Sequence, residues 1–181
     1  MTGEQRTGIV MQVSVSDGGV PKLPVAVGVV TEEGLYGDRQ ADRKNHGGVN
    51  RAVCLYSYEV IQALRAEGHP IEAGSAGENL TISGIDWSAI GPGSQIAIGV
   101  RVILEVTNYT VPCYKNAQWF TAGNFDRMSQ KTHPGESRIY ARVIAGGEVR
   151  RGDLVALLAE PAGSIAPPPP VATYRWPRDF A

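Results

Sequence analysis

The stretch that decides the fold is Leu104-Glu105-Val106-Thr107-Asn108-Tyr109-Thr110-Val111-Pro112-Cys113-Tyr114-Lys115-Asn116. It begins as a strand, because apolar residues at every second position would share one face of the chain. These residues are Val100, Val102, Leu104 and Val106. Pro112 has no backbone N–H, so a central strand is predicted to end before it. Cys113 follows where strand pairing stops, and Lys115 comes two residues later.

Local evidence leaves two interpretations of Cys113 open. A cation such as Lys115 near a thiol favours the thiolate, which is the form that ligates metals and attacks electrophiles. The alternative is a small buried hydrophobe, which is the usual state of an unpaired cysteine. The composition around Cys113 favours this second interpretation.

The composition of the whole chain narrows the class of protein. A length of 181 residues predicts one domain, large enough to bury a core without disulfides, and leaves a small second domain open. A net charge of −1 argues against nonspecific binding of nucleic acid. The two cysteines, Cys54 and Cys113, form no disulfide framework. The N-terminus lacks an apolar signal region and no run is long enough to span a membrane, so we expect a cytoplasmic protein without a membrane partner.

The 22 glycines, 12 prolines and short alternating runs predict a mainly β fold with a few short helices. Strands are expected at 9–15 and 25–30, joined as an opening hairpin. Ser57 is expected to cap a helix over 58–67. The proline-rich run 167–170 cannot join a sheet interior and predicts an extended tail. We therefore expect a domain over residues 1–160 and a tail over 161–181.

The sequence contains two glycine-rich loops, and the first of them could hold an anion. The loop 34–51 combines glycines with several cations, a composition that lets a backbone approach a phosphate. Its basic residues and histidine are Arg39, Arg43, Lys44, His46 and Arg51. The second loop, 74–82, contains Asn79, whose amide both donates and accepts hydrogen bonds. Further along, Arg138, Tyr140 and Arg142 alternate on one face of a predicted strand, where the two arginines could serve an anionic ligand. For both loops and this face, simple exposure to solvent is the alternative.

Four blocks, taken together, resemble the MOSC domain family (molybdenum-cofactor sulfurase C-terminal domain), and most closely its stand-alone bacterial members of the YiiM type. The blocks occur in the family's order over roughly the first 160 residues. They are Gly34-x-x-Gly37-Asp38 with His46-Gly47-Gly48-x-x-Arg51-Ala52; Gly77-Glu78-Asn79-Leu80; Leu104-Glu105-Val106-Thr107 through Pro112-Cys113-Tyr114-Lys115; and Arg138-x-Tyr140-x-Arg142-Val143 with Gly147-x-Val149-x-x-Gly152-Asp153.

The resemblance implies a β-barrel-like fold and a molybdopterin cofactor, with Cys113 as the molybdenum ligand or as a carrier of sulfur. By position it implies a set of cofactor-binding residues: Arg51, Tyr56, Ser57, Glu78, Asn79, Lys115 and Arg142. Asp38 or His46 would assist proton delivery. Many relatives have an arginine two residues before the proline of Pro-Cys, where this chain has Thr110, so one cation fewer is expected beside the thiol.

Three functions follow, in order of preference. The first is a molybdenum-dependent oxidoreductase that reduces a small N-hydroxylated substrate with electrons from a redox partner. The second is a sulfur carrier that holds a persulfide on Cys113, supplied by a pyridoxal-phosphate-dependent desulfurase. The third is a non-catalytic binder of a phosphorylated metabolite. The sequence leaves a homodimer open.

Overall fold

The computed structural model describes residues 6–39 and 48–158. In this part of the chain the strands are β1 (Thr7–Val15), β2 (Leu23–Pro24), β3 (Val27–Thr31), β4 (Gly34–Leu35), β5 (Val53–Ser57), β6 (Leu80–Ser83), β7 (Gln95–Ile98), β8 (Val102–Tyr109), β9 (Ile139–Ala145), β10 (Gly147–Arg150) and β11 (Leu154–Leu157). The α-helix is α2 (Tyr58–Ala66), and short 3₁₀ helices are η1 (Val49–Arg51), η2 (Trp87–Ala89), η3 (Tyr114–Trp119), η4 (Thr121–Gly123) and η5 (Phe125–Met128).

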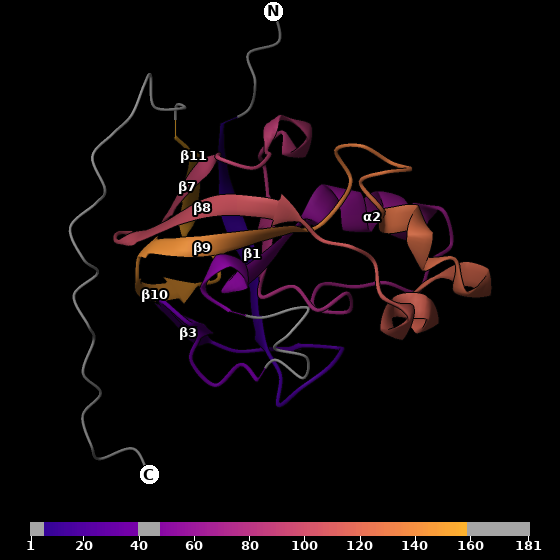
Figure 1. Ribbon diagram of the computed structural model, residues 1–181, viewed down its shortest axis with the longest axis horizontal. Coiled ribbons are helices and arrows are strands. Elements are labelled where there is room, and N and C mark those ends of the chain that lie inside the picture. The colour runs from indigo at the N-terminus through magenta and orange to yellow at the C-terminus, as the bar shows by residue number, and fades with distance from the viewer. Residues whose placement is uncertain (1–5, 40–47, 159–181) are drawn as a thin grey trace, which may run out of the picture.

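Seven of these strands close into a barrel, in the order β1-β6-β5-β9-β8-β7-β11. The closing pair is β1 with β11, in which Thr7 lies opposite Ala156. The pair β5–β6 is parallel, and α2 lies in the connection between its two strands. A smaller sheet, β10-β3-β4, lies beside the barrel (Figure 1). The predicted mainly β, barrel-like fold with a few short helices is therefore confirmed.

Side chains that alternate along the strands fill the barrel. On β8, Val102, Leu104 and Val106 are almost completely buried, as the period-two pattern predicts. Strand β9 places Ile139, Ala141 and Val143 in the same apolar core. The strand β8 ends at Tyr109, three residues before Pro112, as the missing N–H of proline predicts.

Two expectations about the strands are wrong. Val100 does not share the buried face of β8, because Gly99 adopts φ +57° in a turn before the strand, and Val100 is 98% exposed. The opening hairpin of 9–15 with 25–30 does not form either. Strand β3 pairs with β10 and β4, whereas β1 pairs with the two-residue strand β2 and with β6 and β11.

The expected helix over 58–67 is present as α2. The Ser57 hydroxyl accepts a hydrogen bond from the Val60 N–H at 3.3 Å and caps its N-terminus. The helix buries Ile61 and Leu64 in a second apolar cluster with Phe120 and Met128. Those two residues come from the segment after Cys113, whose 3₁₀ helices lie beside α2 in Figure 1. This cluster fixes the chain that leaves the end of β8.

Residues 1–5, 40–47 and 159–181 lie outside the described residues, and with them His46 and the predicted proline-rich tail. Across 6–39 and 48–158, no helix has the length and apolar character needed to cross a membrane.

Candidate functional site

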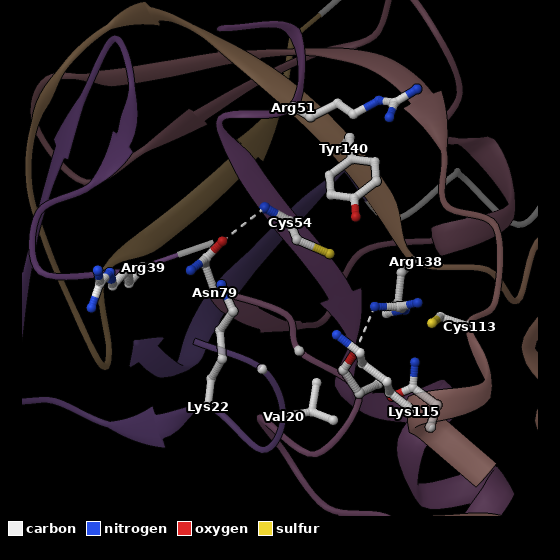
Figure 2. A pocket seen from close by; sticks show the side chains of 14 residues that line it. Val20, Lys22, Arg39, Arg51, Cys54, Asn79, Cys113, Lys115, Arg138 and Tyr140 are labelled. Atoms are coloured by element: carbon white, nitrogen blue, oxygen red, sulfur yellow. Dashed lines mark hydrogen bonds between the residues drawn. The ribbon is translucent and has the colours of Figure 1, made fainter. Parts of the chain in front are cut away.

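A pocket opens beside β5, where β6 and β9 begin and the chain leaves β1 and β8. Its walls come from segments that are distant in sequence but adjacent in the fold. The lining residues are Gly19, Val20, Lys22, Arg39, Arg51, Cys54, Ala76, Gly77, Asn79, Cys113, Lys115, Asn116, Arg138 and Tyr140 (Figure 2). Four of the predicted site residues, Arg51, Asn79, Cys113 and Lys115, are therefore brought together.

Cys113 follows the end of β8 at Tyr109 after a short linking segment and lies directly before η3. Its carbonyl accepts a hydrogen bond from the Asn116 N–H at 2.9 Å, which begins the 3₁₀ turn that carries Lys115. The Cys113 side chain is partly exposed and unpaired. Asn116 is buried, and its Oδ1 has no hydrogen-bond partner. The segment thus presents an accessible thiol beside a polar atom that the protein leaves unsatisfied.

Five cations and no carboxylate stand among the described residues that line the pocket. They come from separate segments: Lys22, Arg39, Arg51, Lys115 and Arg138. The Arg51 guanidinium also lies 5.9 Å from the centre of the Tyr140 ring, which holds it over the aromatic face. In a protein whose net charge is −1, this arrangement gives the pocket a local positive field suited to an anion.

Asp38 lies behind the pocket wall. Its side chain is 3% exposed and forms an ion pair with Lys22. It also accepts hydrogen bonds from the Ser16 N–H and from Asn79 Nδ2, both at 2.9 Å. Asn79 in turn accepts from the Cys54 N–H at 3.1 Å. Asp38 therefore holds Lys22 and Asn79 in place and does not line the pocket, in contrast to the expected position beside a substrate.

Arg138 enters the pocket from the residue before β9. It is 5% exposed, and its Nη1 donates to the Ala76 carbonyl at 2.5 Å. Its Nε is buried without a hydrogen-bond partner. The Thr110 N–H donates to the Arg138 carbonyl at 3.0 Å, so the two residues face each other across β8 and β9. The cation expected to be missing at Thr110 is thus matched by a guanidinium on the adjacent strand.

Cys54 and Tyr140 complete the inner wall. Burial raises the pKa of the Cys54 thiol to about 11, so at neutral pH this thiol keeps its proton and is a poor ligand and nucleophile. Burial also raises the pKa of Tyr140, which keeps its hydroxyl proton available for donation. Of the two cysteines, Cys113 is therefore the one suited to chemistry.

Several predicted binding residues lie elsewhere. Arg142 is exposed and pairs with Glu105 at 2.8 Å, further along β9 than the pocket. Ser57 caps α2, and Tyr56 is buried in the cluster beneath that helix. Glu78 is fully buried, and its Oε1 accepts from the Gly74 N–H at 2.6 Å and from the Thr81 hydroxyl at 3.1 Å. Burial raises the pKa of Glu78.

The sequence analysis named Arg142 as a cofactor-binding residue, whereas Arg138 is the arginine that lines the pocket. Both had been placed on one face of the strand by the alternation of the sequence. Sequence reasoning did not name Lys22, Cys54 and Asn116 as site residues, and it named Tyr140 only as the residue between two arginines on one strand face. Lys22 carried no signal, because its loop has neither a period nor a motif.

These residues fit an anionic, metal-bearing cofactor. The pocket offers cations for a phosphate, a partly exposed thiol for a soft metal, and two buried polar atoms, Asn116 Oδ1 and Arg138 Nε, that lack protein partners. In the described ranges, no group of three or more His, Cys, Asp or Glu side chains could hold a metal ion by itself.

The fold and the pocket define a β-barrel protein whose pocket combines several cations with a partly exposed thiol. The family model described as "MOSC domain" matches residues 42–156. The chain belongs to the MOSC domain family, whose members are associated with binding of the molybdenum cofactor.

Three relatives and one solved structure agree with this assignment. The chain is 32% identical over 143 residues to the uncharacterized protein YflK of Bacillus subtilis, covering 78% of this chain and 63% of YflK. It is 32% identical over 125 residues to YiiM of Escherichia coli, covering 67% and 54%. It is 31% identical over 133 residues to a protein of Gibberella moniliformis named "Reductase", covering 71% and 23%. The chain thus spans less than two thirds of the length of each relative.

The crystal structure of YiiM from Escherichia coli superposes with a TM-score of 0.63 at 26% identity, over 87% of this chain and 72% of that one. The chain is therefore a MOSC domain protein that is similar to YiiM.

Proposed function

We propose that this protein is a molybdenum-cofactor-dependent oxidoreductase that reduces N-hydroxylated compounds, with Cys113 as the protein ligand to molybdenum. The observation that carries the proposal is the partly exposed Cys113 thiol in a pocket whose charged lining residues are all cations. The relative named "Reductase" supports the redox activity. The family resemblance supports the substrate class.

Each part of the pocket has a role in this proposal. Lys115 and Arg138 neutralise the anionic cofactor, and Cys113 supplies a thiolate to a soft metal. The cofactor supplies the two-electron and oxygen-transfer chemistry. Reduction of an N–OH group to N–H consumes two electrons and two protons and releases water, and a redox partner provides the electrons. The Tyr140 hydroxyl and the Lys115 ammonium are proton-bearing groups at the pocket wall.

Metal and pterin content test the proposal directly. The protein is purified from a host that makes molybdenum cofactor, and molybdenum and pterin are assayed together. We expect stoichiometric molybdenum in the wild type and its loss in Cys113→Ser. Tyr114→Ala is the matched control, because Tyr114 is the 72% exposed neighbour and does not line the pocket. Equal molybdenum in the wild type and in Cys113→Ser would contradict the proposal.

A sulfur carrier is the second candidate, favoured by the surroundings of Cys113. Val111 and Tyr114, on either side of the Pro-Cys pair, are 76% and 72% exposed, so a desulfurase could approach this thiol. The same preparation discriminates the two functions. A desulfurase-dependent sulfur adduct on Cys113 without molybdenum would support the carrier. Binding of a phosphorylated metabolite that is unaffected by Cys113→Ser would instead support a non-catalytic binding protein.

A further inference from the structure

Arg138 and Thr110 occupy opposite positions on two adjacent antiparallel segments. Tyr109 pairs with Ile139, and the next step of the same register brings Thr110 opposite Arg138, as the hydrogen bond between their backbones shows. Residues directly opposite in an antiparallel pair project side chains from the same face, with Cβ atoms about 5 Å apart. Position 110 is therefore a second position from which a long side chain could reach the space that Arg138 occupies.

The Arg138 guanidinium lacks the partners that a buried cation requires. Among the described residues it makes one hydrogen bond, to the Ala76 carbonyl, and its Nε makes none. It forms no ion pair with a carboxylate of the described residues. Taking a charge out of water without a counterion is costly, so buried guanidinium groups are normally paired.

Glu78 does not provide the missing counterion. Its electrostatic interaction with Arg138 acts from beyond ion-pair distance, and burial raises the pKa of Glu78 and so favours its neutral form. The remaining side of the guanidinium faces the pocket, next to Cys113 (Figure 2). Gly77 lies beside this part of the pocket, since a Cβ at this position would come within 2.9 Å of Val20 Cγ1 and within 3.9 Å of Arg138 Nη1.

We propose that Arg138 is the anion-binding residue of the pocket and that it binds a phosphate-class oxyanion of the ligand beside Cys113. Thr110, just after β8, carries no charge. Arg138, opposite it and just before β9, supplies the cation instead. The identity of the ligand rests on the proposed function, whereas the anion site itself does not.

Alkylation of Cys113 in the full-length protein, prepared without cofactor, tests the site. The rate of reaction with neutral iodoacetamide is measured with and without inorganic phosphate, and the modified cysteine is identified by peptide mass. The ratio of rates with anionic iodoacetate and neutral iodoacetamide reports the local charge. In the wild type we expect phosphate to slow alkylation and the anionic reagent to be favoured.

Four variants make the test specific. Arg138→Met keeps the buried stem and removes the charge, so it should abolish phosphate protection and lower the reagent ratio by roughly fivefold. Arg138→Lys should keep part of both effects, since the charge remains. Arg142→Met, on the same strand but outside the pocket, should behave as the wild type. The double variant Thr110→Arg/Arg138→Met should restore protection from the opposite strand.

Unchanged phosphate protection in a folded Arg138→Met protein would overturn the inference, as would protection lost equally in Arg142→Met. If Arg138→Met does not fold, the double variant decides: recovered folding together with protection supports the site, and failure of both overturns it. Phosphate protection in a protein that never carries molybdenum would reject the proposed function and still support the anion site.

Discussion

Cys54 and Cys113 line the same pocket, and burial separates their chemistry. Cys54 is 4% exposed on β5, and its backbone N–H is held by Asn79. Cys113 stands at the end of a strand, where pairing has stopped and solvent reaches the side chain. Because the thiolate needs solvent or charge stabilisation, the protein places its usable thiol at the rim and keeps the inner one protonated.

The buried Cys54 predicts a pH dependence of stability. Its pKa rises from an ordinary value of 9.0 to about 11 in the folded protein. Between these values the unfolded chain releases the proton and the folded chain retains it, so the free energy of unfolding falls as pH rises. The loss attributable to Cys54 should reach about 1 kcal/mol at pH 10.

Urea unfolding at pH 8 and pH 10 measures this dependence in the wild type and in Cys54→Ala. The wild type should lose more stability over this interval than Cys54→Ala, because only the wild type contains the Cys54 thiol. The other groups that titrate between pH 8 and pH 10 are the same in both proteins. A parallel decline in the two proteins would contradict the assignment to Cys54.

Asp38 predicts a loss of stability when its charge is removed. Asp38→Asn leaves Lys22, whose side chain is only 10% exposed, without its counterion. Breaking one partner of a buried pair should lower the free energy of unfolding by about 3 kcal/mol. Asp17→Asn is the control, because Asp17 is 91% exposed and its pair with Arg39 is screened by water, so the change should stay within about 0.5 kcal/mol. Denaturant titration of both variants gives the comparison, and equal effects would contradict the buried role.

At the residue scale, the sequence indicated the Cys113 thiol and some of the residues that line the pocket with it. Cys113, Lys115, Asn79 and Arg51 belong to blocks with recognisable spacing, and the fold brings them together. Arg142 shares a face with Arg138, but alternation reports only the face of a strand and not how far along it a pocket extends. The distinction between the two arginines therefore required the register of β8 against β9.

Strand β8 shows what an apolar period predicts at the scale of an element. Its pattern correctly places Leu104 and its neighbours in the core, because every second side chain of a paired strand faces the same way. The pattern fails at Val100. Gly99 adopts a left-handed conformation in the turn before β8, so the Val100 side chain lies outside the alternation of the strand and is exposed.

Two substitutions on this segment make the difference measurable. Leu104→Ala removes a fully buried side chain from the barrel and should lower the free energy of unfolding by about 3 kcal/mol. Val100→Ala should change it by less than about 0.5 kcal/mol, because this side chain is 98% exposed. Thermal or urea unfolding provides the measurement. A large loss in Val100→Ala would mean that Val100 packs against another part of the protein.

The pairing partners of the strands were harder to predict than the strands themselves. Residues 25–30 have the composition of a strand, but their proximity in sequence to β1 did not make them its partner, and the short strand β2 before them pairs with β1 instead. Strand β3 instead pairs with β10, far away in the chain. Local patterns encode which side of a strand is apolar, whereas the choice of partner depends on how all the strands share one core.

The whole barrel depends on the fit of β1 between β6 and β11. At Gly8 an added Cβ would lie 2.0 Å from the Ser83 carbonyl oxygen, a backbone atom that cannot move independently of β6. Gly8→Ala should therefore force β1 away from β6 and lower the free energy of unfolding by roughly 3 kcal/mol. Thr7→Ala, at an exposed position of the same strand, should have little effect. Equal stability of the two variants would contradict the close approach of these strands.

Closure of the barrel through β1 and β11 also bears on how the protein is made. The partner of Thr7 is Ala156, so the first strand of the barrel leaves the ribosome long before its last neighbour exists. Until then β1 and β7 each keep an unpaired edge, which can pair with other nascent chains. Synthesis of Leu154–Leu157 is thus the step that completes the fold, and a ribosome that stalls before this strand leaves a chain prone to aggregation.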